Sequence, residues 1–161
     1  MKLIQSGVAV QQSRDSAAAL QIVVRSVSGF RIRSFANRNG IMPYSEIFND
    51  HIANPRNAGE LPGANGVAEE TNPVCGDRLR LSLLIKNGRI EMARFLAYGC
   101  APTLACGSML AMMIEGMPVK QALQLTRKDL VEALLGLSPQ KQHAAALAIE
   151  TLRAAIKITD A

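Results

Sequence analysis

The fold is decided by one stretch of the chain, residues 79–98, which read LRLSLLIKNGRIEMARFLAY. Before the central Asn87-Gly88 pair, apolar side chains alternate with mostly polar ones, as in a strand with one buried face. Asn-Gly between two such runs is the strongest short signal for a tight hairpin turn. In the return strand, one face carries Ile90, Met92, Arg94, Leu96 and Tyr98, and the other carries Glu91, Ala93, Phe95 and Ala97. Two half-buried antiparallel strands are therefore predicted, and helices must cover one face of the pair.

Helical patterns flank this hairpin on both sides. Pro102 is placed as a first helical residue, and Gly116 lies just past the end of a helix that should be buried nearly all round. Ser138-Pro139 is predicted to cap a long last helix with an apolar stripe. The predicted helices cover residues 43–52, 102–115, 117–125, 126–135 and the stretch after Ser138. The sequence thus predicts an α+β fold, with a small antiparallel sheet of about three strands covered on one face by helices and a long C-terminal helix.

The charge of the chain is concentrated at its N-terminal end. The formal net charge of +5 would suggest nucleic acid or an acidic membrane surface as a partner. Residues 1–41 hold that whole excess, with one acid, Asp15, against six bases, namely Lys2, Arg14, Arg25, Arg31, Arg33 and Arg38. From Met42 onward, twelve bases balance twelve acids. Because the body is neutral and the chain has two tyrosines, four phenylalanines and no tryptophan, nucleic-acid binding is not predicted.

The basic segment over residues 1–41 has three interpretations. Its Arg- and Ser-rich, acid-poor composition is typical of a mitochondrial transit peptide. It is also consistent with an upstream start-site artefact, because Met42 directly precedes the first predicted helix. Alternatively, it is a native extension that packs on the body through residues 17–24. We favour the artefact or a disordered tail and give the segment no chemical role. One domain is predicted over residues 42–161, because the chain is long enough for one hydrophobic core.

The cysteine content and the apolar runs bear on the compartment. Three cysteines cannot pair completely, and their spacing does not resemble the framework of a small secreted domain. A reducing compartment, the cytoplasm, is therefore predicted, or the mitochondrial matrix if residues 1–41 are a transit peptide. The longest apolar run of the body, around residues 104–114, is too short to span a bilayer, so no membrane segment is predicted.

Three side chains with metal-binding chemistry flank the predicted hairpin. Cys75 and Asp77 lie in a turn just before the first strand, and Cys100 follows Gly99 at the end of the return strand. If the strands pair as predicted, the start of one and the end of the other lie at the same end of the sheet. We therefore expect the three side chains to share a corner. Cys100 also precedes the Pro102 helix, and the positive N-terminal end of a helix favours the thiolate form of a cysteine.

A fourth donor, His143, lies in the first turns of the last predicted helix. Two thiolates, a carboxylate and an imidazole can complete a tetrahedral zinc site or ligate a 2Fe-2S unit with mixed donors, and the donor types alone do not choose between them. A carboxylate is a harder and weaker donor to thiophilic iron than a thiolate. A site that contains Asp77 should therefore hold a cluster loosely, as delivery requires. The remaining sulfur-containing residues of the buried helix are predicted to pack in the core, namely Cys106, Met109, Met112 and Met113.

At these residues the sequence resembles the IscU/NifU-type iron-sulfur cluster assembly scaffold family, over about residues 43–157. The matching motifs, in order, are Tyr44-Ser45, His51, Asn54-Pro55-Arg56-Asn57 with Gly59, residues 72–77, Tyr98-Gly99-Cys100 and residues 137–143. Several spaced motifs in the right order are far more specific than any one of them. The resemblance implies that Cys75, Asp77, Cys100 and His143 bind iron and a labile 2Fe-2S cluster, or zinc.

The chain departs from the family pattern at one position. The residue after this histidine is normally a third cysteine, a cluster ligand also implicated in accepting sulfur, whereas here it is Ala144. This departure puts in doubt persulfide transfer to that position and tight cluster binding, and it leaves the fold prediction intact. Cys106 is the alternative third thiol, although we expect it to be a core residue.

Three functions remain open after these observations. The leading one is a scaffold, not an enzyme, that receives sulfur from a cysteine desulfurase and passes a labile cluster to apo Fe-S proteins. The resemblance implies these partners, together with an Hsp70-type chaperone and co-chaperone that read the region of Leu137, Pro139 and Lys141. A homodimer around a shared cluster stays open. The second function is a zinc-bound sulfur acceptor. The third, a thiol enzyme with Cys100 as nucleophile and His143 as base, would leave the second thiol and Asp77 without a role.

Overall fold

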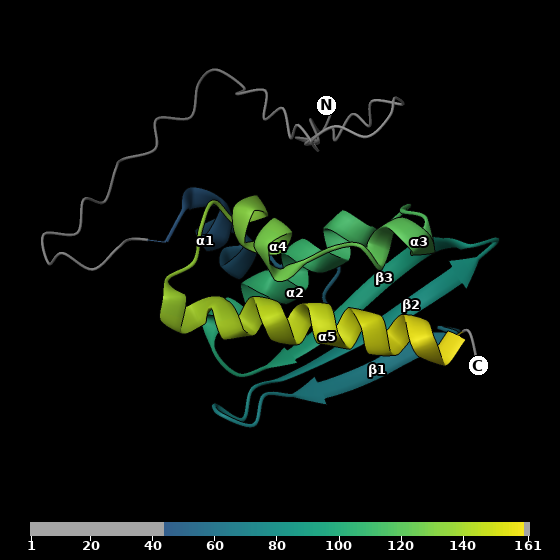
Figure 1. The fold of residues 1–161 in the computed structure, drawn as a ribbon, viewed down its shortest axis with the longest axis horizontal. Helices are drawn as coiled ribbons and strands as arrows, with labels where there is room; N and C mark the ends of the chain where they lie inside the picture. Colours follow the sequence, from purple (N-terminus) through teal and green to yellow (C-terminus); the bar gives the residue numbers. More distant parts are fainter. Residues whose placement is uncertain (1–43, 160–161) are drawn as a thin grey trace, which may run out of the picture. The chain divides into compact units, whose positions relative to one another are not determined.

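The computed structural model describes residues 44–159, and the predicted extension over residues 1–41 lies outside them. The elements follow in the order α1 (Glu46–Ala53), β1 (Gly66–Thr71), β2 (Arg78–Lys86), β3 (Arg89–Tyr98), α2 (Ala101–Ile114), α3 (Val119–Ala122), α4 (Arg127–Ala133), the 3₁₀ turn η1 (Pro139–Lys141) and α5 (Gln142–Thr159) (Figure 1). The predicted α+β class, with a three-stranded antiparallel sheet and a long last helix, is confirmed.

The predicted hairpin forms the centre of the sheet, whose strand order is β1-β2-β3. Asn87 and Gly88 both have positive φ, 51° and 71°, as a two-residue type I′ turn requires. The inward face of β2 is fully buried at Leu79, Leu81 and Leu83. The sequence predicted about three strands but did not indicate where the third, β1, lies. Two consecutive glutamates, Glu69 and Glu70, interrupt the apolar alternation of this edge strand.

The return strand contains a bulge that the sequence pattern did not predict. Ile85 pairs with Ile90, but Leu84 pairs with Met92, so Glu91 is an extra residue on β3. An extra residue shifts all later side chains to the opposite face. Ile90 is therefore buried on the same face as Ala93 and Phe95, although the predicted alternation placed it on the opposite face. The single alternation predicted from Ile90 to Tyr98 is wrong for this reason.

Two helices cover the inward face of the sheet (Figure 1). Helix α5 packs over β1 and β2, α2 packs mainly over β3, and the two helices also contact each other. Helix α2 approaches β3 closely at Gly107, where a Cβ atom would lie 2.5 Å from Cδ2 of Phe95. A side chain at Gly107 would therefore overpack the core beneath α2.

The helix boundaries differ from the predicted ones at three places. Helix α1 begins at Glu46, because the Ser45 hydroxyl caps it by accepting from the Phe48 N–H at 3.0 Å. The predicted helix over 117–125 is reduced to the single turn α3. Ser138 precedes η1 and makes no side-chain cap, so its predicted role as the cap of the last helix is wrong. In the part of the chain that the structure describes, no helix combines the length and the apolarity needed to cross a bilayer.

The predicted burial of α2 holds for most of its residues. Cys106 and Met109 are buried in the core, and Met113 packs against it. Met112 is 36% exposed, so its predicted core role is wrong. The described elements therefore cover its side chain only in part.

Helix α4 ends with a leucine in a conformation that favours glycine. Leu135 has φ of 57°, and the N–H groups of Leu135 and Gly136 donate to the carbonyls of Glu132 and Val131, both at 2.9 Å. These two hydrogen bonds form a Schellman motif, in which the left-handed residue is usually glycine. Because the Leu135 side chain is 66% exposed, little packing offsets its backbone strain.

Replacing Leu135 by glycine is expected to stabilise the fold by about 0.5–1 kcal/mol, because the left-handed strain is removed at little packing cost. Urea unfolding of the metal-free protein measures this change. Leu123→Gly is the matched control, since Leu123 has a right-handed φ of −65° at the end of α3 and glycine there should destabilise. A loss of stability in Leu135→Gly would show that the exposed side chain makes stabilising contacts.

Candidate metal centre

A tight loop before β2 presents Cys75 and Asp77. The Asn72 N–H donates to the Asp77 carbonyl at 2.8 Å, the Gly76 N–H donates to the Asn72 carbonyl at 2.8 Å, and the Val74 N–H donates to Oδ1 of Asn72 at 2.9 Å. Gly76 has φ of 73°, which glycine adopts without strain. This closed loop leaves Cys75 exposed at its tip, while Asp77 turns inward and is only 6% exposed.

The second loop, between β3 and α2, brings Cys100 to the same corner of the sheet. Arg78 pairs with Tyr98 at the end of the hairpin, so Asp77 and Gly99 lie side by side. The Cys100 thiol donates to Oδ2 of Asp77 at 2.9 Å, and Cys100 is the N-cap residue of α2. The predicted corner shared by Cys75, Asp77 and Cys100 is therefore present.

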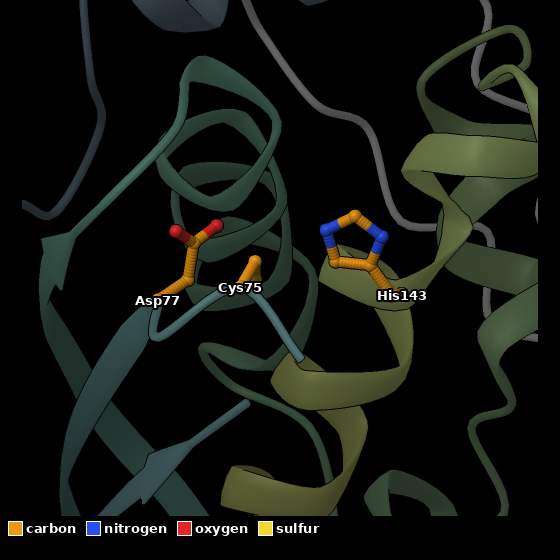
Figure 2. A group of neighbouring side chains, drawn as sticks. All are labelled: Cys75, Asp77 and His143. Atoms are coloured by element: carbon orange, nitrogen blue, oxygen red, sulfur yellow. The ribbon is translucent and has the colours of Figure 1, made fainter. Parts of the chain in front are cut away.

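Helix α5 adds the imidazole of His143, its second residue. The ligand atoms of Cys75, Asp77 and His143 all lie within 4.8 Å of one another. Figure 2 shows Cys75 between the Asp77 carboxylate on one side and the His143 ring on the other. Cys100 does not belong to this group of three, and it adjoins the group through its hydrogen bond to Asp77. The four predicted residues thus meet at one corner, and three of them lie close enough together that they could hold a metal ion.

The hydrogen bonds around Asp77 favour its ionised form. Burial raises the pKa of Asp77, but hydrogen bonds from the side chains of Cys100 and Thr103, from the Cys100 backbone and from the Cys75 thiol outweigh it, so the pKa lies below the ordinary range. A carboxylate must be ionised to bind a metal ion. The donor set, with two thiols, one carboxylate and one imidazole, fits zinc and also fits a mixed-ligand iron-sulfur cluster.

Two residues near the site lie in the core. Cys106 is fully buried, and burial, with a smaller effect from Cys100, raises its pKa to about 12. Such a thiol remains protonated and is a poor ligand, so the predicted core role of Cys106 agrees with its surroundings. Ala144, at the position where the family pattern has its third cysteine, is also fully buried. Neither residue belongs to the group of donors around Cys75.

Sequence reasoning missed a buried polar network that anchors the first helix. Nδ1 of His51 lies 2.7 Å from the Ser108 hydroxyl, and the Arg56 backbone N–H donates to the same oxygen at 2.8 Å. His51 is buried on α1 and Ser108 is buried on α2. The network therefore joins α1 and the loop after it to the helix that carries Cys100 at its start. The position of His51 among the apolar residues of a predicted helix could have indicated that it is buried. Its partner could not be found in this way, because Ser108 lies 57 residues further along the chain.

The stability of the metal-free protein is expected to fall below about pH 6.5 because of His51. Burial lowers the pKa of His51, Arg56 lowers it further, and Asp50 opposes both, with a net decrease from 6.5. As pH falls, the His51 imidazole of the unfolded chain takes up a proton before that of the folded protein does. The stabilising contribution of neutral His51 is therefore complete above the unfolded pKa and is lost as pH falls through the folded pKa. The loss grows as pH falls from the unfolded pKa towards the lower folded pKa. Urea unfolding between about pH 7.5 and pH 5.5 measures it.

His51→Gln should flatten this pH dependence, whatever it costs in stability at neutral pH. His143→Gln is the matched control, because the chain has two histidines. An equally steep dependence in His51→Gln would contradict the assignment.

The segment that the family resemblance connects with a chaperone lies between α4 and α5. Leu137 is buried, Pro139 is exposed and Lys141 is partly exposed. Pro139–Lys141 form η1 directly before the helix that carries His143. In this folded segment Pro139 and Gln140 are exposed, whereas Leu137 belongs to the core.

A small α+β domain that gathers two thiols, a carboxylate and an imidazole at one end of its sheet defines a metal- or cluster-binding domain. The model of the NifU-like N-terminal domain family matches residues 43–159. The chain belongs to this family, as the order of its sequence motifs predicted.

Several relatives carry names that refer to iron-sulfur cluster assembly or nitrogen fixation. An iron-sulfur cluster assembly scaffold protein of Aquifex aeolicus is 47% identical over 116 residues, which are 71% of this chain and 74% of the relative. The mitochondrial iron sulfur cluster assembly protein 1 of Schizosaccharomyces pombe is 32% identical over 144 residues, which are 87% of this chain and 74% of the relative. A nitrogen fixation protein NifU of Azotobacter chroococcum is 36% identical, over 70% of this chain and 37% of the relative.

Two solved structures share the fold. A NifU-like N-terminal protein from Brucella abortus matches with a TM-score of 0.59 and 16% identity, over 72% of this chain and 93% of that one. A protein from Fervidobacterium islandicum, described as an iron-sulfur cluster assembly scaffold for the SUF system, matches with a TM-score of 0.57 and 22% identity. The match covers 70% of this chain and 96% of that one. At these identities the likeness supports the architecture, which agrees with the predicted fold class.

Proposed function

We propose that this protein is an iron-sulfur cluster assembly scaffold that holds iron and a labile cluster as cargo and passes the cluster to apo-proteins. The observation that carries the proposal is the convergence of Cys75, Asp77 and His143 within 4.8 Å, with Cys100 bonded to Asp77, in a chain of the NifU-like N-terminal domain family. The names of its relatives support the same role. The working domain is residues 42–161, since every one of these donors lies inside it.

The arrangement of the site suits the transfer of a cluster rather than its permanent storage. Cys75 is exposed at the tip of its loop, beside Val74, which is 92% exposed, so another protein can reach the thiol. The carboxylate of Asp77 is a hard donor, and hard donors bind thiophilic iron more weakly than thiolates do. We therefore propose a 2Fe-2S cluster held by the four residues and released easily.

The proposed partners are those of a scaffold. They are a cysteine desulfurase that supplies sulfur at the exposed Cys75 loop, an Hsp70-type chaperone with its co-chaperone at residues 137–141, and apo Fe-S proteins that receive the cluster. No catalytic role is proposed. The Cys100 thiol bonds to Asp77 and lies 3.5 Å from the Thr103 hydroxyl, and among the described hydrogen bonds none joins it to His143. The described hydrogen bonds therefore do not support a pair of Cys100 as nucleophile and His143 as base.

A zinc-bound sulfur acceptor is the second candidate function. The alanine at position 144 favours it, because two thiolates, one carboxylate and one imidazole form a complete tetrahedral zinc set without a third thiolate. In that function, zinc would hold the two thiolates until a desulfurase delivers sulfur.

Anaerobic reconstitution with iron and sulfide, followed by absorption spectra and metal analysis, separates these functions. Visible charge-transfer bands with stoichiometric iron, followed by transfer to an apo-ferredoxin, are expected for a scaffold. A protein that retains zinc alone would be the sulfur acceptor. Binding of neither metal would overturn both functions.

A further inference from the structure

A buried hydroxyl beside the proposed ligands is not explained by the fold alone. Thr103, the third residue of α2, is fully buried, and its Oγ1 donates to Oδ2 of Asp77 at 2.7 Å. The same Oδ2 accepts from the Cys100 thiol at 2.9 Å. The Thr103 hydroxyl also lies 3.5 Å from Sγ of Cys100. One hydroxyl thus contacts two of the four proposed ligands.

Other helical threonines of the chain bond differently. Thr151 and Thr159 lie on α5, and their hydroxyls donate to the carbonyls four residues earlier, of Leu147 at 2.7 Å and Ala155 at 3.3 Å. This local bond is the usual way to satisfy a threonine within a helix. At Thr103 it is not formed, because the residue four positions earlier, Gly99, precedes the helix. The hydroxyl instead reaches across 26 positions of sequence to Asp77.

The Asp77 carboxylate is enclosed on its other side by Gly99. A Cβ atom at Gly99 would lie 2.3 Å from Oδ1 of Asp77, and Gly99 has φ of 148°. The missing side chain makes room for Oδ1, while Thr103 and Cys100 bond to Oδ2. These contacts fix the carboxylate in one orientation. Water scarcely reaches it, because Asp77 is only 6% exposed.

We propose that Thr103 is a positioning residue of the metal site, which holds the Asp77 carboxylate in the orientation in which it faces Cys75 and His143. The proposal rests on the function proposed above. A hydrogen bond from outside the first coordination sphere fixes the rotation of a ligating carboxylate, and loss of such a partner typically lowers metal affinity about 10–100-fold. Thr103 acts through Asp77 and does not itself bind the metal.

The test measures Zn²⁺ and Co²⁺ affinity of the full chain by competition with a chelator, together with the Co²⁺ absorption spectrum. Thr103→Val keeps the shape and removes the hydroxyl, so its affinity should fall by about 10–100-fold. Thr103→Ser keeps the hydroxyl and should restore most of the affinity. Thr151→Val is the matched control, because this equally buried hydroxyl bonds only within α5, and its affinity should not change.

A double-mutant comparison separates positioning from a general loss of structure. In an Asp77→Ala background, Thr103→Val should produce no further loss of affinity, because the group through which Thr103 acts is absent. An equal further loss in that background, or wild-type affinity and spectrum in Thr103→Val, would overturn the proposal. If the wild-type protein bound neither ion, the positioning proposal and the zinc-bound sulfur acceptor would both fail, and the reconstitution with iron and sulfide would decide separately on the scaffold. Failure of the Thr103 variants alone leaves the proposed function standing.

Discussion

Replacing Cys75 or Cys100 by serine is expected to abolish stable metal binding while the domain still folds. Serine keeps the size of the side chain but replaces a soft thiolate by a neutral hydroxyl, which is a poor ligand for zinc or iron. Because loss of an outer-sphere partner already lowers affinity about 10–100-fold, loss of a ligand should lower it by at least about 100-fold. Chelator competition with Zn²⁺ and the iron content after reconstitution measure the effect.

Folding should survive both changes because neither thiol belongs to the core. Cys75 is exposed on its loop and Cys100 is partly exposed at the start of α2. Cys106→Ala is the control that removes a thiol outside the group of donors. If Cys75→Ser or Cys100→Ser kept the metal content of the wild type, that residue would be removed from the site. The result for Cys100 is the more informative of the two, because its thiol bonds to Asp77 and lies outside the group of three donors.

The sequence predicted those parts of the molecule that local patterns encode. The hairpin was predictable because Asn87-Gly88 specifies its turn and the leucines of β2 specify its buried face. The meeting of Cys75, Asp77 and Cys100 then followed from the hairpin alone, since antiparallel pairing brings both ends of the pair together. The family was predictable from the order of the motifs, and the match to residues 43–159 confirms it.

What the sequence did not predict depends on single residues or on distant partners. The bulge at Glu91 shifts the faces of β3, yet one extra residue leaves no sign in a chain where both faces of the strand contain apolar side chains. β1 carries too few apolar residues to be recognised as a strand. The contacts of Thr103 with Asp77 and of His51 with Ser108 join residues far apart in sequence, and no local pattern indicates which hydroxyl meets which group.

We expect the position after His143 to affect how tightly the proposed site holds a cluster. Ala144 is fully buried and directly follows a proposed ligand on α5. The family pattern has a cysteine at this position, so a thiol there would add a soft donor on the residue next to His143, and a soft third thiolate binds iron more strongly than a carboxylate does. Metal binding would have to overcome the burial that favours the protonated thiol. One added sulfur atom in a closed core costs about 1–3 kcal/mol of stability through overpacking, so the variant must be compared with the wild type in its metal-free form as well.

Ala144→Cys is therefore expected to lengthen the lifetime of a reconstituted cluster on the order of 10-fold, within the range by which changes around a metal site alter affinity. The decay of the visible absorption in the presence of a chelator measures this lifetime. Cys106→Ala should leave the lifetime unchanged and cost about 1 kcal/mol of stability, as expected for a small core cavity. If Cys106→Ala instead destroyed the cluster and Ala144→Cys added nothing, α2 would have to open to bring the buried thiol of Cys106 to the metal. The third thiolate would then come from the core of the domain, and the lability of the cluster would reflect the cost of opening α2 rather than the hardness of the Asp77 carboxylate.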